Sequence, residues 1–109
     1  MSLRERGQVL PVTSEVAGFV DSSGIEYDWR RVDMPLPRQL LARGLVRPGP
    51  LALGIDAYPG GATVSATGEV SEVLFALGPP LRGVWWESTA VTDVAAQAKA
   101  LAARLVAAK

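Results

Sequence analysis

The chain has 109 residues, of which 49% are hydrophobic and 20% charged, with eleven basic and eleven acidic side chains. These proportions are typical of one small globular domain and argue against a disordered chain. The balanced charge offers no basic surface for nucleic acid. The sequence contains neither Cys nor His, which excludes disulfides, thiol nucleophiles and the usual zinc ligands, so catalysis would depend on other side chains or on a cofactor.

The sequence carries no recognisable targeting or membrane signal. Residues 1–7 (MSLRERG) are polar and lack the apolar core of a signal peptide. No run approaches the roughly 20 apolar residues that a membrane-spanning helix needs. We therefore expect a cytoplasmic protein without a membrane partner, forming a single domain over residues 1–109 with a frayed start over residues 1–8.

The first half of the chain predicts short, irregular elements. Residues 9–20 are β-like but interrupted by Pro11 and Gly18, which predicts one or two short strands with a hairpin around Thr13-Ser14. Residues 21–24 (DSSG) indicate a turn, and the alternation over residues 25–29 indicates a short half-buried strand or an extended loop.

A short helix is predicted over residues 35–44. Prolines stand at its start, where a missing N–H costs nothing, and Gly44 stands where a left-handed C-terminal cap belongs. Its expected buried face consists of Leu36, Leu40 and Leu41.

The second half predicts strands and then a long helix. Residues 51–57 and 62–65 form the expected hairpin around a turn at 58–61, a second turn follows at 66–69, and the apolar residues 73–77 predict a strand covered on both faces. Val94, Ala98, Leu101 and Leu105 recur at helical spacing near the end of the chain. Asp93 suits the first turn of that helix and Lys109 its other end, with Ser88 or Thr92 as the expected cap.

These elements predict an α/β or α+β domain. We expect a small sheet of four to six short strands, a short mid-chain helix, and a long C-terminal helix packed on one face of the sheet.

Four segments together resemble a known family. They are residues 21–24 (DSSG), 28–31 (DWRR), 37–57 (PRQLLARGLVRPGPLALGIDA) and 74–91 (LFALGPPLRGVWWESTAV), with Gln97 and Ala98 beyond. This combination resembles the C-terminal part of the FAD- and NAD(P)-binding flavoprotein oxidoreductases, in an uncharacterised branch of that group. The resemblance covers residues from about 21 to 106 and is weak over the first twenty.

The resemblance implies a flavin-binding wall. Residues 74–78 would be the last strand of the FAD-binding lobe, and the following helix would direct its N-terminus at the pyrimidine edge of the flavin. A helix N-terminus stabilises the negative charge of a reduced flavin by about 0.3–2 kcal/mol. The residues that would line the flavin are Gly78, Pro79, Ser88, Thr89 and Ala90. In the wider class an Asp follows the glycine, and Pro79 stands there in this chain.

The chain departs from the family in lacking a GxGxxG fingerprint. Gly60-Gly61 does not replace it, since no helix is expected to follow. We therefore expect a C-terminal segment of a flavin- and nicotinamide-dependent oxidoreductase-like protein. The whole protein would pass hydride from NAD(P)H to FAD, whereas this chain alone would have no turnover and would bind neither cofactor appreciably. We assign no catalytic residue and no metal ligand.

A different class of function remains open. The chain could be a non-catalytic interaction module that forms a homodimer, or binds missing N-terminal lobes, through Trp85 or Trp86 and the strand at 74–78. A stand-alone hydrolase is disfavoured, because no nucleophile–base pair is evident.

Each candidate residue of the 78–90 segment also has a plain structural interpretation. Gly78 and the two prolines after it form either the flavin-side turn or a rigid loop exit. Ser88 and Thr89 would donate to a flavin carbonyl or, as we favour, cap the helix. Of Trp85 and Trp86, which face opposite ways in an extended chain, one should fill the core.

The charged candidates are open in the same way. Arg82 could bind a phosphate or Glu87, but an ordinary surface arginine is favoured. Glu87 could be a general acid or base, but a hydrogen bond to the helix start is favoured.

Tyr27, Asp28 and Trp29 suggest a substrate-side loop or, preferably, a half-buried strand. Several arginines make the middle of the chain basic, which suggests an NADP phosphate site or, preferably, solvated surface; they are Arg30, Arg31, Arg38, Arg43 and Arg47.

Overall fold

The computed structural model describes residues 2–3, 6–7 and 9–108. Its elements, in chain order, are β1 (Ser2–Leu3), β2 (Val12–Thr13), α1 (Pro35–Ala42), β3 (Ala62–Val64), β4 (Val70–Phe75), the 3-10 helix η1 (Pro79–Leu81) and α2 (Val91–Ala107). Both strand pairs are antiparallel: β1 with β2 and β3 with β4. This is an α+β arrangement of two separate two-stranded pairs, so the expected sheet of four to six strands is wrong for the described residues.

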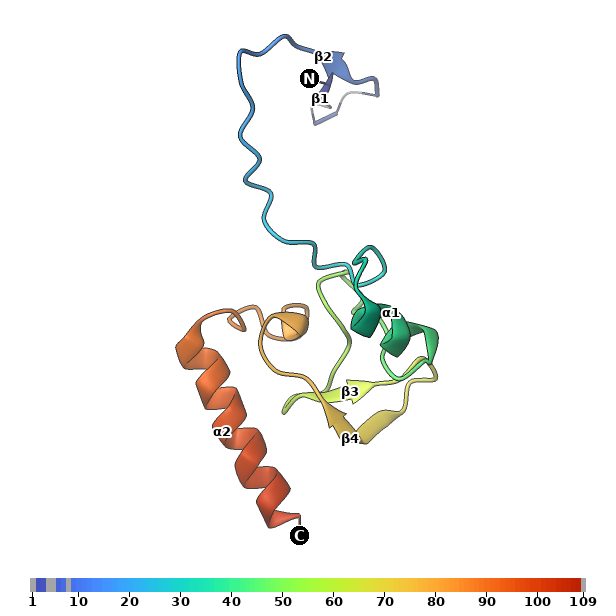
Figure 1. Ribbon diagram of the computed structural model, residues 1–109, viewed down its shortest axis with the longest axis vertical. Coiled ribbons are helices and arrows are strands. Elements are labelled where there is room, and N and C mark those ends of the chain that lie inside the picture. Colours follow the sequence, from blue (N-terminus) through green and yellow to red (C-terminus); the bar gives the residue numbers. More distant parts are fainter. Residues whose placement is uncertain (1, 4–5, 8, 109) are drawn as a thin grey trace.

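The chain consists of a rounded body and an N-terminal arm that extends away from it (Figure 1). We call residues 9–26 the arm. The Cα radius of gyration is 18.0 Å and the longest extent is 62 Å, whereas a compact domain of this length has a radius near 13 Å. The arm accounts for the elongation.

The arm carries little of the predicted β-structure. Only Val12–Thr13 form a strand, and they pair with Ser2–Leu3 rather than with a neighbouring segment of the arm. The hairpin expected around Thr13-Ser14 is therefore wrong. Of the start expected to fray, residues 1, 4–5 and 8 lie outside the described residues.

The last residues of the arm continue into an extended loop that leads to α1. The turn predicted over residues 21–24 forms only in part: the backbone N–H of Ser23 donates to Asp21 Oδ1 at 2.9 Å and Gly24 has a φ of +84°, but the backbone itself makes no turn there. Residues 25–28 form no strand, so the extended-loop alternative is correct.

Helix α1 forms where the sequence predicts it. Prolines stand in its first turn, and Gly44, with a φ of +66°, donates its N–H to Leu41 O at 3.0 Å. This is the left-handed ending that the glycine predicts. The expected buried face is partly wrong, because Leu36 is 66% exposed while Leu40 and Leu41 are half-buried.

The strand expected over residues 51–57 does not form. Ala52 and Gly54 have φ values of +55° and +97°, which an extended strand cannot accommodate. Only single bridges remain, between Pro48 and Ile55 and between Ala57 and Thr63. The predicted turn at 58–61 is present, because Gly61 N–H donates to Tyr58 O at 2.9 Å.

Strands β3 and β4 form an antiparallel hairpin in the body. Ala62 faces Phe75 and Val64 faces Val70, with a register irregularity between them. The strand expected over residues 73–77 begins and ends earlier, and its burial on both faces is wrong, because Val73 is 91% exposed. The buried apolar side chains of the core are Val46, Ile55, Ala57, Ala62, Val64 and Leu81.

Helix α2 is the longest element and lies beside the body (Figure 1). Arg104 lies over the Phe75 ring, 5.6 Å from its centroid, and Gln97 accepts a hydrogen bond from Gly78. No residue of α2 is fully buried, and Leu105 of the expected apolar stripe is 44% exposed. The helix is thus placed at the side of the hairpin by a few contacts, and the expected packing across one face of the sheet is wrong.

Candidate functional site

The sequence-predicted site begins at Gly78, where the chain leaves β4. Gly78 is buried, and its φ of +73° and ψ of −143° lie in a region that L side chains avoid. Its N–H donates to Gln97 Oε1 at 3.1 Å. A Cβ at this position would lie 3.4 Å from Val94 Cγ2 and 3.7 Å from the Ser88 carbonyl oxygen. Gly78 therefore joins the end of the hairpin to the start of α2.

The loop after Gly78 is held by backbone hydrogen bonds to residues 53–55. Ile55 N–H donates to Pro80 O at 2.9 Å and Gly83 N–H donates to Leu53 O at 2.7 Å. A Cβ on Gly54 would lie only 2.0 Å from Pro80 O. The two backbones meet at a distance that only glycine permits, and this fixes the path from η1 towards α2.

Ser88 lies in a closed environment just before α2. The residue is 0% exposed, and its Oγ is buried without a hydrogen-bond partner in the described part of the chain. Buried hydroxyls are normally hydrogen-bonded. The unpaired Oγ is the feature of this segment that points most directly to a missing partner.

The N-terminus of α2 has no side-chain cap. Ala90 occupies the N-cap position, and its carbonyl oxygen accepts hydrogen bonds from Asp93 and Val94. Neither Ser88 nor Thr92 caps the helix, so the capping interpretation that we favoured is wrong. The positive end of the helix dipole is therefore left for solvent or for an external group.

The structure brings some of the predicted residues together. Gly78 and Ser88 are neighbours, and Thr89 and Ala90 follow Ser88 at the exposed start of α2. Pro79 is exposed on the first position of η1. The start of α2 can present backbone N–H groups to a ligand, and the unpaired Ser88 hydroxyl is enclosed beside it. Among the described residues, no three His, Cys, Asp or Glu side chains gather as metal ligands would.

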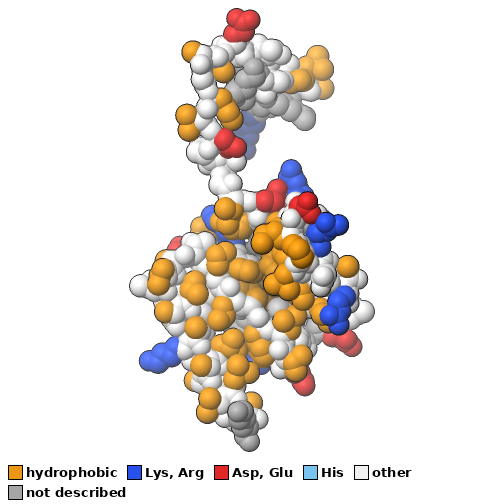
Figure 2. All heavy atoms as spheres, viewed as in Figure 1, with side chains coloured by type: hydrophobic (Ala, Val, Ile, Leu, Met, Phe, Trp, Pro, Cys, Tyr) orange, Lys and Arg blue, Asp and Glu red, His pale blue; other side chains and the backbone are white. Residues whose placement is uncertain are grey.

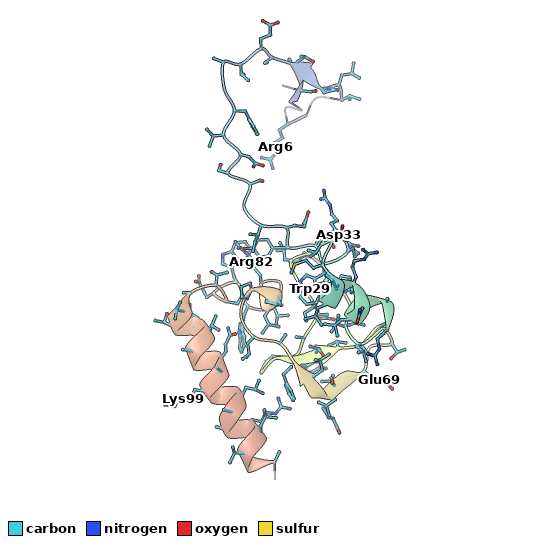
Figure 3. All side chains as sticks on the ribbon, in the orientation of Figure 1. Arg6, Trp29, Asp33, Glu69, Arg82 and Lys99 are labelled. Carbon is cyan, nitrogen blue, oxygen red and sulfur yellow. The ribbon has the colours of Figure 1, made fainter. Side chains whose placement is uncertain are left out.

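Arg82 occupies an environment that the sequence did not indicate. Its guanidinium carbon lies 4.5 Å from the centroid of the Tyr27 ring and 4.3 Å from that of the Trp86 ring. Its Nη1 donates to the Tyr27 hydroxyl, while its Nε is buried without a described partner. Arg82 is thus neither an ordinary surface arginine nor the ion-pair partner of Glu87; it joins Tyr27, the first residue after the arm, to the loop before α2. Figure 3 labels Arg82 in this part of the body.

The tryptophan pair also differs from expectation. Trp85 and Trp86 are 39% and 61% exposed, so neither fills the core. Trp85 N–H donates to Leu81 O at 2.7 Å, which places the pair in a turn instead of an extended chain. Trp86 stacks on Arg82, whereas Trp85 takes no part in this stacking and remains partly exposed.

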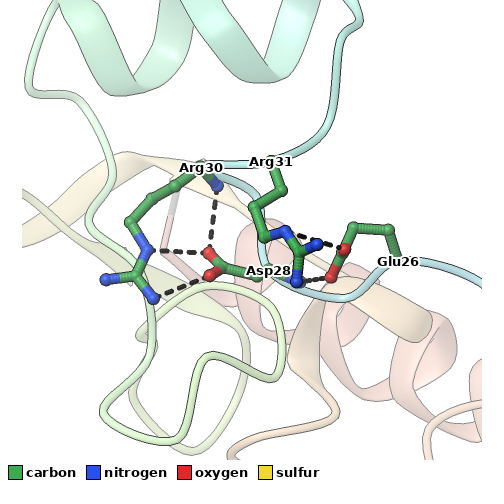
Figure 4. Close-up of polar contacts among 4 residues, drawn as sticks. All are labelled: Glu26, Asp28, Arg30 and Arg31. Carbon is green, nitrogen blue, oxygen red and sulfur yellow. Dashed lines mark hydrogen bonds and ion pairs between the residues drawn. The ribbon is translucent and has the colours of Figure 1, made fainter. Parts of the chain in front are cut away.

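Most of the predicted basic region is neutralised by nearby carboxylates. Asp28 accepts two hydrogen bonds from the Arg30 guanidinium, at 2.7 and 2.8 Å, and Arg31 pairs with Glu26 at 3.3 Å (Figure 4). The hydrogen bond from Arg30 lowers the pKa of the Asp28 carboxyl, and that of Asp21 is lowered by hydrogen bonds from Ser23. Further ion pairs join Arg38 to Asp33 and Arg47 to Asp56. These pairs favour the solvated-surface interpretation over a phosphate site.

Comparisons with other proteins do not assign the chain to a family. No family model matches the chain, and no similar curated protein or solved structure was found. None of the described helices is long and apolar enough to cross a bilayer.

Proposed function

We propose that this chain is the C-terminal segment of a flavin- and nicotinamide-dependent oxidoreductase-like protein. In this proposal, the Gly78 turn and the start of α2 form the wall that meets the pyrimidine edge of the flavin. The observation that carries the proposal is the buried, unpaired Ser88 Oγ beside an uncapped helix N-terminus. Both features suit a group that accepts hydrogen bonds and carries partial negative charge.

The residues of the wall would have separate roles. Ser88 Oγ would donate to a ring carbonyl, and the exposed backbone at Thr89 and Ala90 would approach the ring edge. Gly78 would hold the wall in place, since its N–H is already committed to Gln97. When bound, the flavin would supply the hydride and electron chemistry.

The diphosphate of FAD has no matching cradle here. Gly60 and Gly61 belong to the turn between Ala57 and β3, and no helix follows them. The proposal therefore concerns the flavin ring and not the whole dinucleotide. We expect weak binding of a flavin ring by this chain alone, with a Kd on the order of 1 mM, about −4 kcal/mol.

An NMR titration of the full chain with FMN tests the proposal. We expect amide shifts confined to Gly78 and residues 88–91, with weaker binding by Ser88→Ala. Ser22→Ala, an exposed serine of the arm, is the matched control and should bind like wild type. Inorganic phosphate serves as a second titrant, because the FMN phosphate alone could seek an arginine. Unmoved amides at 78 and 88–91, or equal shifts with phosphate, would overturn the proposal.

A non-catalytic interaction module is the second candidate, and one observation favours it. The arm exposes large apolar side chains that touch little of the body, among them Leu10, Phe19 and Val20 at 74%, 67% and 87%. Figure 2 also shows hydrophobic side chains spread over the visible face of the body. Exposed apolar patches mark protein interaction sites.

Sedimentation velocity separates the second candidate from the first. A module of this kind should self-associate in a concentration-dependent manner, and the paired change Phe19→Ser and Val20→Ser should weaken that association. A single monomeric boundary at all concentrations would count against it without touching the flavin proposal.

A further inference from the structure

A cavity of about 250 Å³ lies between α2 and the body. The turn before β3 contributes Gly60, the end of β4 leads into Leu77, and α2 contributes Gln97, Leu101 and Arg104. Trp85 lies at its wall. The lining is mostly apolar and carries few polar groups, which is the usual composition of a small-molecule site.

The position of Arg104 gives this cavity a positive charge at its edge. A Cβ on Gly60 would lie 3.2 Å from Arg104 Nη1, and the guanidinium carbon lies 5.6 Å from the Phe75 centroid. The guanidinium is thereby held between the turn and the hairpin. Arg104 makes no ion pair with any carboxylate of residues 2–3, 6–7 and 9–108, so its charge is available to a ligand.

Gln97 adds a hydrogen-bond donor of known orientation. Its Oε1 accepts from the Gly78 N–H, and because only the oxygen of an amide side chain accepts, Nε2 must occupy the other position. Nε2 donates no hydrogen bond within the described part of the chain. The cavity thus offers an amide donor as well as a guanidinium.

Trp85 supplies a flat apolar surface. Trp85 is 39% exposed and borders the cavity, so its ring can stack on a second ring. An apolar cavity of about 150 Å³ holds one benzene molecule. The larger volume here leaves room for one ring and a short polar arm.

We infer that this cavity binds a small aryl carboxylate, with its ring against Trp85 and its carboxylate on Arg104 and the Gln97 amide. The inference goes beyond the proposed flavin wall, since Trp85 and Arg104 are not part of that wall. A guanidinium–carboxylate hydrogen bond is charge-assisted, so the carboxylate should contribute much of the affinity.

Isothermal titration of the full chain with benzoate and phenylacetate tests this inference, with benzamide as the neutral analogue and acetate as the ring-free one. We expect saturable binding of at least one aryl acid, at least tenfold weaker binding of benzamide, and none of acetate. Arg104→Gln should weaken the aryl acid at least tenfold, and Arg104→Lys less. Arg43→Gln removes an exposed arginine from the end of α1 and should leave binding unchanged.

Three results would overturn the inference: no saturable binding of either aryl acid at millimolar concentration, equal binding of benzamide, or wild-type binding by a folded Arg104→Gln. If Arg104→Gln does not fold, the comparison of benzoate with benzamide on the wild-type chain still shows whether the cavity recognises the carboxylate. Failure here leaves the FMN titration at Ser88 unaffected, so the two proposals can fall separately.

Discussion

The arm and the body use similar apolar residues in different ways. In the body, Ile55, Val64 and Leu81 are 2%, 3% and 1% exposed, whereas Val9 and Val20 of the arm are 84% and 87% exposed. Hydrophobicity alone therefore does not decide which side chains are buried. The difference lies in the backbone contacts that bring distant segments of the body together.

Those contacts depend on a few glycines. Gly54 N–H donates to Tyr27 O at 2.8 Å, and the neighbouring Ile55 N–H donates to Pro80 O. The loop at 51–55 thus contacts both Tyr27, which directly follows the arm, and the loop that carries η1. Gly18 and Gly24 of the arm have no atoms within 4 Å of an added Cβ, so the arm lacks equivalent contacts at its glycines.

The largest expected effect follows from a change at Gly54. Gly54→Ala forces a Cβ to within 2.0 Å of Pro80 O at a φ of +97°, and we expect a loss of about 3 kcal/mol or more in the free energy of unfolding. Urea denaturation measures it. Gly24→Ala, at a φ of +84° in open space, should cost only the backbone strain, about 1–2 kcal/mol. Equal costs would show that the close backbone contact does not stabilise the body.

Truncation of apolar side chains sharpens the same comparison. Ile55→Ala should cost about 2–5 kcal/mol, since Ile55 is almost fully buried. Val20→Ala removes methyl groups that are already in water and should change stability by less than about 0.5 kcal/mol. Both values come from urea denaturation. A large cost at Val20 would mean that the arm packs in solution and would contradict the contrast between the two regions.

Arg82 tests the connection between the two regions. Arg82→Gln removes the stacking on Tyr27 and Trp86, and we expect a cost of about 1–2 kcal/mol. Hydrogen exchange should also increase at residues 27–29, since the segment that connects the arm to the body would be released. Arg43→Gln is the control, with an expected change within about 0.5 kcal/mol. Unchanged exchange at residues 27–29 would contradict this role.

The smallest expected effect concerns acid stability. Folding lowers the pKa of Asp28 through its hydrogen bond from Arg30, so its contribution is present above the unfolded pKa of about 3.9 and is lost as the pH falls through the lower folded value. Asp28→Asn should therefore reduce the fall in Tm between about pH 5 and pH 3. Parallel Tm curves for the variant and the wild type would contradict this.

Local signals in the sequence predicted local structure well. The prolines of α1, the glycine after it and the apolar spacing of α2 each act within a few residues, and the helices form at these places. The turn at 58–61 and strand β3 were predictable for the same reason. The strand over residues 51–57 failed because Ala52 and Gly54 adopt positive φ values that depend on contacts with residues 80–83.

In the candidate site, too, local features could be predicted from the sequence, whereas features that depend on tertiary contacts could not. The order of strand, glycine turn and helix was readable from residues 74–91, but the burial of Ser88 and its unpaired hydroxyl depend on how the loop folds back on Gly78. The contact between Tyr27 and Arg82, which are 55 residues apart, left no signal in either local pattern. The cavity beside Arg104 arises from the placement of α2 against the body, which its periodicity does not specify.

The affinity of the chain for FMN in its two redox states tests the flavin wall most directly. Reduced FMN carries negative charge at the pyrimidine edge, and the helix N-terminus should favour it by about 0.3–2 kcal/mol, which corresponds to roughly 2- to 30-fold tighter binding. Anaerobic NMR titrations should show this preference at the amides of Gly78 and residues 88–91. Equal or weaker binding of reduced FMN, or shifts elsewhere only, would contradict the assignment of this wall.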